Sequence, residues 1–410
     1  MSERIAKCRI CGGKDLIEVL DLGKQVLTGV FPKTRDADLT AGPLVLLKCS
    51  GDDGCGLLQL AHSYDLDEMY GENYGYRSGL NASMVAHLKS KVKKIESYGL
   101  VDANSIIVDI GSNDGTTLGL YEVEDVRLVG IDPTAGKFRA HYKPGVEIIA
   151  DFFSAECFQS IFGDEKARVV TSFSMFYDME DPTGFMDQIA QILDDKGIWV
   201  CEQSYMPLML ETNSYDTVCH EHLEYYALEQ VFWMAEATGL EIVDVELNAI
   251  NGGSFSFVAQ KKGGALTRND AVDDLFAKER AMNLGDIETY RAFAEAVVTH
   301  RAELLAFLNK AKAEGKRVAA LGASTKGNVL LQYCGITTDL VEAIGEVNPD
   351  KFGAFAPGTN IPIIDEAELI STNPDYYIVL PWHFKPYFEA EQRYEKLNLI
   401  FPLPELTGTR

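Results

Sequence analysis

Short apolar runs alternate with helical stretches from about residue 66 to residue 264, and this alternation limits the possible folds more than any other feature. Runs of this kind, each followed by a turn and a helix, are typical of parallel strands joined by crossover helices. The clearest example is SIIVDIGSNDGTTL (105–118), which predicts a strand, a glycine-rich turn and a helix start. EIVDVELNAINGGSFSFVAQKKGG (241–264) predicts two strands that close the block. The expected fold class is therefore α/β, with a central Rossmann-like domain.

Polar or aromatic residues follow successive strands of this block. VRLVGIDPTAG (126–136) places Asp132 at a strand end, where it could bind ribose hydroxyls. EIIADFFS (147–154) predicts a third strand. After it, Asp151 offers a hydrogen-bond acceptor and Phe152 offers a flat ring where an adenine would lie. The block lacks the Gly-x-Gly-x-x-Gly motif that binds the pyrophosphate of NAD. The order of these residues at successive strand ends therefore favours S-adenosylmethionine over NAD. The predicted cofactor residues are Asp109, Gly111, Asn113, Asp132, Asp151, Phe152 and Ser174.

Four of the eight cysteines lie in the first 65 residues, as Cys8-x-x-Cys11 followed by Cys49 and Cys55. Two close pairs about forty residues apart have the spacing of a zinc ribbon, in which four thiolates close a tetrahedron. Such a site has no open position for a substrate. The sequence therefore predicts a structural Zn²⁺ that stabilises a small N-terminal domain.

The last block begins after a mostly helical stretch from 265 to 314. Its first segment, KRVAALGASTKGNVLLQYCG (316–335), again predicts a strand, a glycine-rich turn and a helix. In its GASTKG turn, hydroxyls and a lysine at a helix N-terminus suit a phosphate or diphosphate, although a purely structural turn is also possible. YYIVLPWHF (376–384) predicts a later strand ending at the same edge. The expected domains are 1–65, 66–264 and 265–410.

Charge and hydropathy exclude several classes of protein. Across 410 residues, 37 Lys and Arg face 62 Asp and Glu, and the formal charge of −25 argues against general binding to nucleic acids. No uncharged apolar run approaches the roughly 20 residues that span a bilayer, and no signal peptide is apparent at the start. We therefore expect a cytoplasmic protein with reduced cysteines, no membrane partner and a monomeric state.

The segment VCHEHLEYY (218–226) could be a metal site, an acid–base site or the polar start of a helix that buries one tyrosine. Residues two apart point to different sides of a strand or a helix, so only one of the two histidines is expected to reach a pocket. His220 would then be a buried or orienting residue. The local pattern alone leaves these alternatives open.

Taken together, the motifs resemble the bacterial nucleotide-sugar C-methyltransferases, which add branches to 4-keto-deoxyhexoses. The resemblance covers nearly the whole chain, and it rests on the ordered motifs Cys-x-x-Cys-Gly, CGLLQL, YGYRSGLNASM, DIGSNDGTTL, ADFFS, HEHLEYY, NGGSF, GASTKGN and LPW. It implies a zinc domain, a middle domain that binds S-adenosylmethionine, and a second Rossmann-like α/β domain that helps to hold the nucleotide sugar.

The resemblance also implies roles for individual residues. His222 would be the base, with Glu221 beside it, Tyr74 or Tyr76 as a helping hydroxyl, and His220 as a further member of the site. Cys219 stands where the family has a tyrosine. The implied substrate residues are Arg77, Ser78, Asn81, Ser324, Thr325, Lys326, Asn328 and His383.

The chemistry of such an enzyme suits an imidazole. A carbon next to a ketone is a weak acid, and the enolate formed by removing its proton can attack a sulfonium methyl group; a tyrosine or His220 could stabilise the oxyanion. Three alternatives compete with this hypothesis. They are a metal-dependent hydrolase at the His-Glu-His segment, a non-catalytic protein that binds nucleotide sugars, and an O- or N-methyltransferase that needs no ketone.

Overall fold

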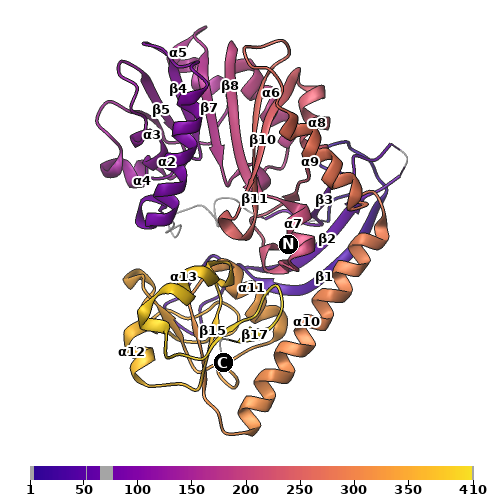
Figure 1. Ribbon diagram of the computed structural model, residues 1–410, viewed down its shortest axis with the longest axis vertical. Coiled ribbons are helices and arrows are strands. Elements are labelled where there is room, and N and C mark those ends of the chain that lie inside the picture. The colour runs from indigo at the N-terminus through magenta and orange to yellow at the C-terminus, as the bar shows by residue number, and fades with distance from the viewer. Residues whose placement is uncertain (1–3, 52, 65–76, 409–410) are drawn as a thin grey trace.

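Three β-sheets are arranged along the long axis of the protein in the computed structural model, which describes residues 4–51, 53–64 and 77–408. A seven-stranded sheet lies at one end and a six-stranded sheet at the other (Figure 1). Strands of a four-stranded sheet lie between them. Both larger sheets are mainly parallel and carry helices, so the predicted α/β class is confirmed. None of the described helices has the length and apolar character needed to cross a membrane.

The four-stranded sheet is antiparallel and has the order β1-β2-β3-β9. Its strands are β1 (Leu16–Val26), β2 (Ala41–Cys49), β3 (Leu58–Leu60) and β9 (Glu224–Tyr225). The first three come from the N-terminal region, whereas β9 belongs to the histidine-rich segment. Glu224 and Tyr225 thus form a strand and not the start of a helix. This pairing fixes the histidine-rich segment against the N-terminal sheet.

The seven-stranded sheet has the order β10-β11-β8-β7-β4-β5-β6. The chain runs outward from the central β4 to β5 and β6, and then returns to the other side of β4 for β7 and β8. Ligands of such sheets bind beyond the carboxyl ends of the strands, where the order reverses. The strands are β4 (Ile106–Ile110), β5 (Arg127–Ile131), β6 (Glu147–Ile149), β7 (Ala167–Phe173), β8 (Leu193–Ser204), β10 (Leu240–Asn248) and β11 (Ser254–Lys261).

Helices cover both faces of this sheet, as expected for parallel strands that are buried on both sides. All five residues of β4 are buried. The helices of this part are α2 (Ala82–Ser97), α3 (Thr116–Gly119), α4 (Ala135–Phe138), α5 (Ala155–Phe162), α6 (Pro182–Ile192), α7 (Met206–Glu211) and α8 (Leu228–Ala237). Four 3-10 turns also bear on the site, namely η1 (Ser78–Leu80), η3 (Phe176–Asp178), η4 (Tyr215–Thr217) and η5 (Ile250–Gly252).

Two helices, α9 (Asp270–Ala281) and α10 (Ile287–Ala313), connect to the last sheet, and α10 runs along one side of the molecule (Figure 1). The six-stranded sheet has the order β14-β13-β12-β15-β16-β17, with its own reversal beside β12. Its elements are β12 (Val318–Leu321), α11 (Thr325–Cys334), β13 (Ile344–Glu346), β14 (Ile363–Asp365), α12 (Glu366–Ser371), β15 (Tyr376–Val379), η7 (Trp382–Phe384), α13 (Lys385–Ala390), β16 (Leu399–Phe401) and β17 (Thr407–Gly408).

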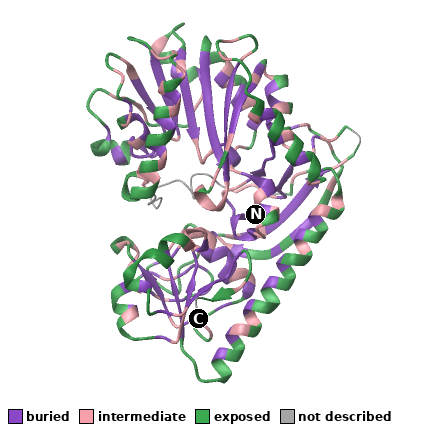
Figure 2. Ribbon diagram, in the orientation of Figure 1, coloured by how far each residue is buried: buried purple, intermediate pink, exposed green. Residues whose placement is uncertain are grey.

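One hydrophobic core joins the N-terminal sheet to the six-stranded sheet through α10. The buried residues of α10 recur every three or four positions, so that they form one face against β1 and α11. Figure 2 marks the buried residues of both sheets in purple. Each fully buried leucine in this core, such as Leu304, contributes roughly 1.5–3 kcal/mol relative to an exposed one. The shared core holds the last sheet firmly against the histidine-rich segment.

Candidate active site

The four predicted zinc ligands form one cluster beside the N-terminal sheet. Their sulfur atoms all lie within 4.8 Å of one another, and the Sγ atoms are 3.5 Å apart both for Cys8 and Cys55 and for Cys11 and Cys49. Four thiolates bound to zinc at about 2.3 Å lie about 3.8 Å apart at the corners of a tetrahedron. The cluster therefore fits zinc. Because protein sulfur fills all four positions, the site is structural.

Backbone hydrogen bonds shape the knuckles that present these thiolates. The Cys8 carbonyl accepts from the Gly12 N–H at 2.9 Å, and Gly12 has a positive φ of 70°. Between the first two ligands, the Arg9 guanidinium donates to the Leu60 carbonyl at 2.6 Å, and its Nε lies 3.6 Å from Oε1 of Glu224. The zinc knuckle is thereby linked to β9.

The glycine turn after β4 is closed by Asp132 from the end of β5. Asp132 Oδ2 accepts from the Asn113 N–H at 2.9 Å, and Oδ1 accepts from the Thr134 N–H and hydroxyl, both at 2.6 Å. Gly115 has a φ of 73°, and a Cβ added there would lie 2.6 Å from the Tyr142 ring. The Tyr142 hydroxyl donates to the Asn113 carbonyl at 2.8 Å. Glycine is therefore required for this turn to pack.

Other predicted cofactor residues lie along the same sheet edge. Gly111 has a φ of 71°, and a Cβ there would meet Met175 at 3.1 Å, so both the backbone conformation and the close approach of Met175 favour glycine. Phe152 is 44% exposed beyond β6, next to the exposed Asp151, and Ser174 follows β7. A glycine turn, a buried carboxylate and an accessible ring at neighbouring strand ends fit S-adenosylmethionine.

Asp109 differs from these residues because it lies within β4. Its side chain is 3% exposed and accepts a hydrogen bond from the Thr171 hydroxyl at 2.5 Å. Burial raises the pKa of Asp109 to about 7. The carboxyl group thus belongs to the interior beneath the turn.

Two of the predicted substrate residues lie against the cofactor turn. The Ser78 N–H donates to Oδ1 of Asn113 at 3.1 Å, and Nε of Arg77 lies 3.5 Å from Oδ2 of Asp114. The 3-10 turn η1 therefore covers the loop after β4. Arg77 and Ser78 are placed where they could act on either ligand.

Of the other predicted residues of the segment YGYRSGLNASM (74–84), the structure describes Asn81. Asn81 caps α2 by accepting from the Ser83 N–H at 3.0 Å, and it is exposed. Tyr74 and Tyr76 lie outside the described residues, so their roles stay predictions.

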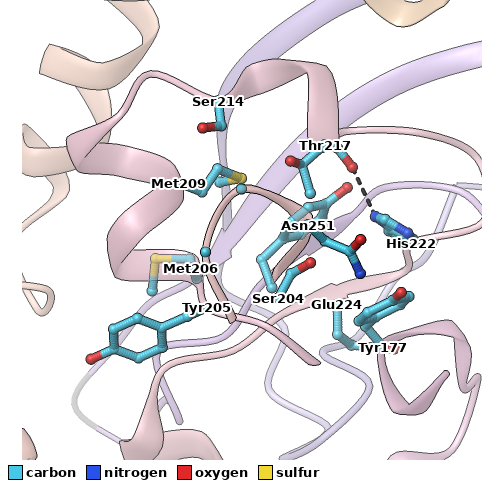
Figure 3. A pocket seen from close by; sticks show the side chains of 13 residues that line it. Tyr177, Ser204, Tyr205, Met206, Met209, Ser214, Thr217, His222, Glu224 and Asn251 are labelled. Carbon is cyan, nitrogen blue, oxygen red and sulfur yellow. Dashed lines mark hydrogen bonds between the residues drawn. The ribbon is translucent and has the colours of Figure 1, made fainter. Parts of the chain in front are cut away.

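A cavity opens next to the carboxyl edge of the seven-stranded sheet (Figure 3). It is bounded by η3, the end of β8, α7, η4, β9 and η5, and His222 lies on its wall. The lining residues are Tyr177, Ser204, Tyr205, Met206, Met209, Ser214, Thr217, His222, Glu224, Tyr225, Asn251, Gly252 and Gly253. Of the two histidines in the predicted segment, only His222 is among them.

The His222 ring is held in one orientation. Its Nδ1 lies 2.9 Å from the Thr217 carbonyl, and its ring stacks at a tilt on Tyr177 with centroids 4.2 Å apart. A carbonyl only accepts, so Nδ1 carries the proton in the neutral ring and Nε2 keeps a lone pair. Burial, and after it the positive charge of Lys326, lower the pKa of His222 to about 3. The imidazole is therefore neutral, and its Nε2 is unprotonated.

His220 and Glu221 face other parts of the structure. His220 is fully buried, with Nε2 3.4 Å from the Gly42 carbonyl and its ring edge-on to Tyr64, and burial lowers its pKa to about 4. Glu221 points toward Gly29, where an added Cβ would lie 2.8 Å from its Oε1. Burial raises the pKa of Glu221. Neither side chain lines the cavity, so any effect of theirs on His222 is indirect.

The GASTKG turn lies at the reversal of the six-stranded sheet, between the ends of β12 and β15. Ser324 caps α11 by accepting from the Gly327 N–H at 3.0 Å. Thr325 lies near Gly29 of the N-terminal region, 3.8 Å from the position of an added Cβ. Asn328 is fully buried and donates to the Thr28 carbonyl at 2.8 Å. Asn328 therefore joins α11 to the N-terminal region.

Lys326 and His383 extend from the last sheet toward the cavity. The Lys326 amino group donates to the carbonyl of Asn251, a lining residue. Burial, and after it the charge of Lys326, lower the pKa of His383 to about 3. The Cβ of His383 lies 3.6 Å from the position of an added Cβ on Gly252. Both residues thus adjoin η5 of the middle block.

Sequence reasoning did not assign several residues that the structure brings to the site. Tyr177 follows β7, Thr217 precedes the histidines by a few positions, and Asn251 begins the NGG turn. A polar residue just after a parallel strand could have pointed to Tyr177. The role of Thr217 depends on its carbonyl, which side-chain patterns do not reveal.

Comparisons with known proteins follow the same order along the chain. The family model described as "Putative zinc binding domain" matches residues 8–70, "Methyltransferase domain" matches 84–245, and "C-methyltransferase C-terminal domain" matches 249–404. Solved structures that resemble part of the chain include an O-methyltransferase family protein from Burkholderia thailandensis, at 16% identity with a TM-score of 0.37 over 49% of this chain and 64% of that one. At that level the structural likeness adds nothing to the assignment.

The relative C-methyltransferase NovU of Streptomyces niveus is 30% identical over 408 residues, which cover 98% of this chain and 96% of that protein. The chain carries the four clustered thiolates and the cofactor turn described above. It belongs to the C-methyltransferase family and is an S-adenosylmethionine-dependent enzyme with a zinc-binding N-terminal region.

Proposed function

We propose that this enzyme methylates the ring carbon next to the ketone of a nucleotide-linked 4-keto-deoxyhexose, with C-3 as the acceptor and His222 as the base. The observation that carries the proposal is the orientation of His222. Its Nδ1 is tied to the Thr217 carbonyl and its ring lies on the cavity wall, so that Nε2 is the proton acceptor. A ketone-activated carbon needs such a base, whereas O-methylation needs no acidic C–H bond.

The cavity and the cofactor edge support the arrangement of the two ligands. Asp132 would accept from ribose hydroxyls, Phe152 would contact the adenine, and the glycine turn after β4 would lie against the rest of the cofactor. When bound, S-adenosylmethionine supplies an electrophilic methyl group. Ser204 at the end of β8 and Tyr177 after β7 line the cavity, so the substrate carbon would lie on the same side of the sheet as the cofactor.

The nucleotide diphosphate would bind at the N-terminus of α11. The first N–H groups of a helix are not used within the helix and carry a partial positive charge. Ser324 and Thr325 add hydroxyls there, and α11 packs against η4, which carries Thr217. A chain with a net charge of −25 needs a local positive region of this kind to hold an anion.

A panel of nucleotide sugars tests this proposal. The enzyme is incubated with S-adenosylmethionine and 4-keto-6-deoxy sugars, and products are scored by mass for one added methyl group and by NMR for a new carbon–carbon bond. The matched control is each sugar with a 4-hydroxyl in place of the ketone. We expect C-methylation of at least one ketone and of no alcohol. A methyl group on oxygen or nitrogen, or equal turnover of the alcohols, would overturn the proposal.

A further inference from the structure

Lys326 brings a cation from the last sheet against Asn251, a residue that lines the cavity of the middle block. It lies in the first turn of α11, and its amino group donates to the Asn251 carbonyl. Figure 3 shows Asn251 near Thr217 and His222. Two further contacts hold the regions together, since α11 packs against η4 and η7 packs against η5. The hydrogen bond to Asn251 and these two packing contacts together hold the ammonium group beside η5.

The ammonium group keeps donors for a ligand. It has three N–H bonds, and within the described part of the chain the Asn251 carbonyl is its one hydrogen-bond acceptor. The nearby carboxyl group of Asp216 is 1% exposed, and its Oδ2 accepts from the Trp382 indole at 2.8 Å. Burial lowers the pKa of Lys326, while the charge of Asp216 raises it. Asp216 therefore favours the charged form of the lysine.

Lys326 lies next to the cavity wall to which His222 belongs, because its amino group donates to the Asn251 carbonyl and both Asn251 and His222 line the cavity. The positive charge of Lys326 contributes, after burial, to the lowered pKa of His222 and to that of His383. A second positive charge on His222 would therefore be costly while Lys326 is charged. The cost falls if a negative charge forms between them in the same step.

We propose that the Lys326 ammonium group donates a hydrogen bond to the ketone oxygen of the substrate and stabilises the negative charge that forms there when His222 takes the neighbouring proton. This inference rests on the proposed function. It assigns Lys326 to the reacting ketone, in place of the diphosphate that the sequence suggested for it.

The step balances in atoms and charge. The C–H bond breaks, its proton moves to Nε2 of His222, and its electron pair forms the carbon–carbon double bond of the enolate. The π electrons of the carbonyl move to oxygen, which accepts the hydrogen bond from Lys326. Before the step, Lys326, His222 and the reacting ketone together carry one positive charge, on the lysine. Afterwards they carry two positive charges and one negative charge, so their net charge is unchanged.

The test measures exchange of the substrate's α-hydrogen with deuterated water in the absence of a methyl donor, together with kcat and KM for methylation. Lys326→Met removes the charge at similar length, and Lys326→Arg keeps a charge. The matched control is Lys33→Met. The exposed Lys33 also donates to backbone carbonyls across a contact between the N-terminal region and the last sheet, at 2.6 Å to Asp350, away from the cavity.

We expect Lys326→Met to lower exchange and kcat by about 10²–10³-fold, the usual loss for one oxyanion donor, with a small change in KM. Lys326→Arg should retain part of both rates, methylammonium should partly rescue Lys326→Ala, and Lys33→Met should resemble the wild type. Wild-type exchange in Lys326→Met with a large rise in KM would overturn this inference and assign the lysine to the diphosphate. If the wild type neither exchanges the α-hydrogen of any ketone nor methylates one, that result refutes the proposed function on which this inference rests.

Should Lys326→Met fail to fold, Lys326→Arg and the amine rescue still decide the question. A folded Lys326→Ala protein whose exchange is slow and indifferent to added amine would contradict the proposal. Loss of the ammonium should also raise the pKa of His222, which NMR of the imidazole can follow without turnover.

Discussion

A single methyl group at Gly115 tests how the cofactor turn is built. Gly115 has a φ of 73°, and a Cβ there would lie 2.6, 2.7 and 2.9 Å from three atoms of the Tyr142 ring. Ordinary carbon contacts are about 3.5–4.0 Å. Tyr142 cannot move freely, because its hydroxyl bonds to the Ser112 hydroxyl at 2.7 Å and to the Asn113 carbonyl at 2.8 Å.

The expected cost of Gly115→Ala follows from these contacts. The left-handed backbone costs an alanine about 1–2 kcal/mol, and overpacking adds about 1–3 kcal/mol. The free energy of unfolding should therefore fall by about 2–5 kcal/mol. If the ring moves instead, its two hydrogen bonds are lost, at about 0.5–1.5 kcal/mol each, and the Asn113 backbone is released. Affinity for S-adenosylmethionine should fall in either case.

Gly119→Ala is the matched control. Gly119 is the last residue of α3, the helix that Gly115 caps; it is exposed, and no atom of the described residues lies within 4 Å of an added Cβ. Alanine there should raise stability by about 0.5–1 kcal/mol. Urea unfolding and calorimetry of cofactor binding measure both variants. A Gly115→Ala protein with wild-type stability and wild-type affinity would refute this account of the turn.

Three further predictions concern the metal, the cofactor and pH. Cys49→Ser should lose zinc by metal analysis and lower the melting temperature, whereas Cys157→Ser, outside the cluster, should keep its zinc; equal zinc contents would rule out the four-thiolate site. Asp132→Ala should weaken S-adenosylmethionine binding by roughly 1–3 kcal/mol in calorimetry, and unchanged affinity would contradict the placement. Because burial and Lys326 lower the pKa of His222 to about 3, protonation of His222 should cause no loss of kcat/KM as the pH falls through 6.5. A fall in kcat/KM near pH 6.5 that is absent in His222→Asn would refute this prediction.

The parallel sheets were predictable because their signal is local. Apolar runs such as 105–110 are buried along their whole length, and glycines follow them where a positive φ is needed. The zinc cluster was predictable for a different reason, because two close pairs of cysteines have few other uses even when they lie far apart in the chain. The strand prediction needs only the local sequence, whereas the zinc prediction needs the chemistry of the ligands.

The histidine-rich segment shows where local reasoning ends. Glu224 and Tyr225 form a two-residue strand only because β3, more than 160 residues earlier in the chain, offers an edge. The opposite directions of His220 and His222 follow from spacing, but the Thr217 carbonyl that orients His222 has no sequence signature. The meeting of Lys326 with Asn251 likewise depends on the packing of η4 against α11. These contacts arise from tertiary structure.

The proton acceptor is the central claim, and exchange in His222→Asn measures it most directly. Asparagine keeps a hydrogen-bonding group of similar reach but removes the base. With a 4-keto substrate in deuterated water and no methyl donor, the variant should lose α-hydrogen exchange, and methyl transfer should fall by at least the roughly 10²–10⁴-fold typical of general-base loss. Binding of both ligands should be nearly unchanged, and the exposed His141→Asn should behave as the wild type. Exchange at the wild-type rate in folded His222→Asn protein would contradict the assignment.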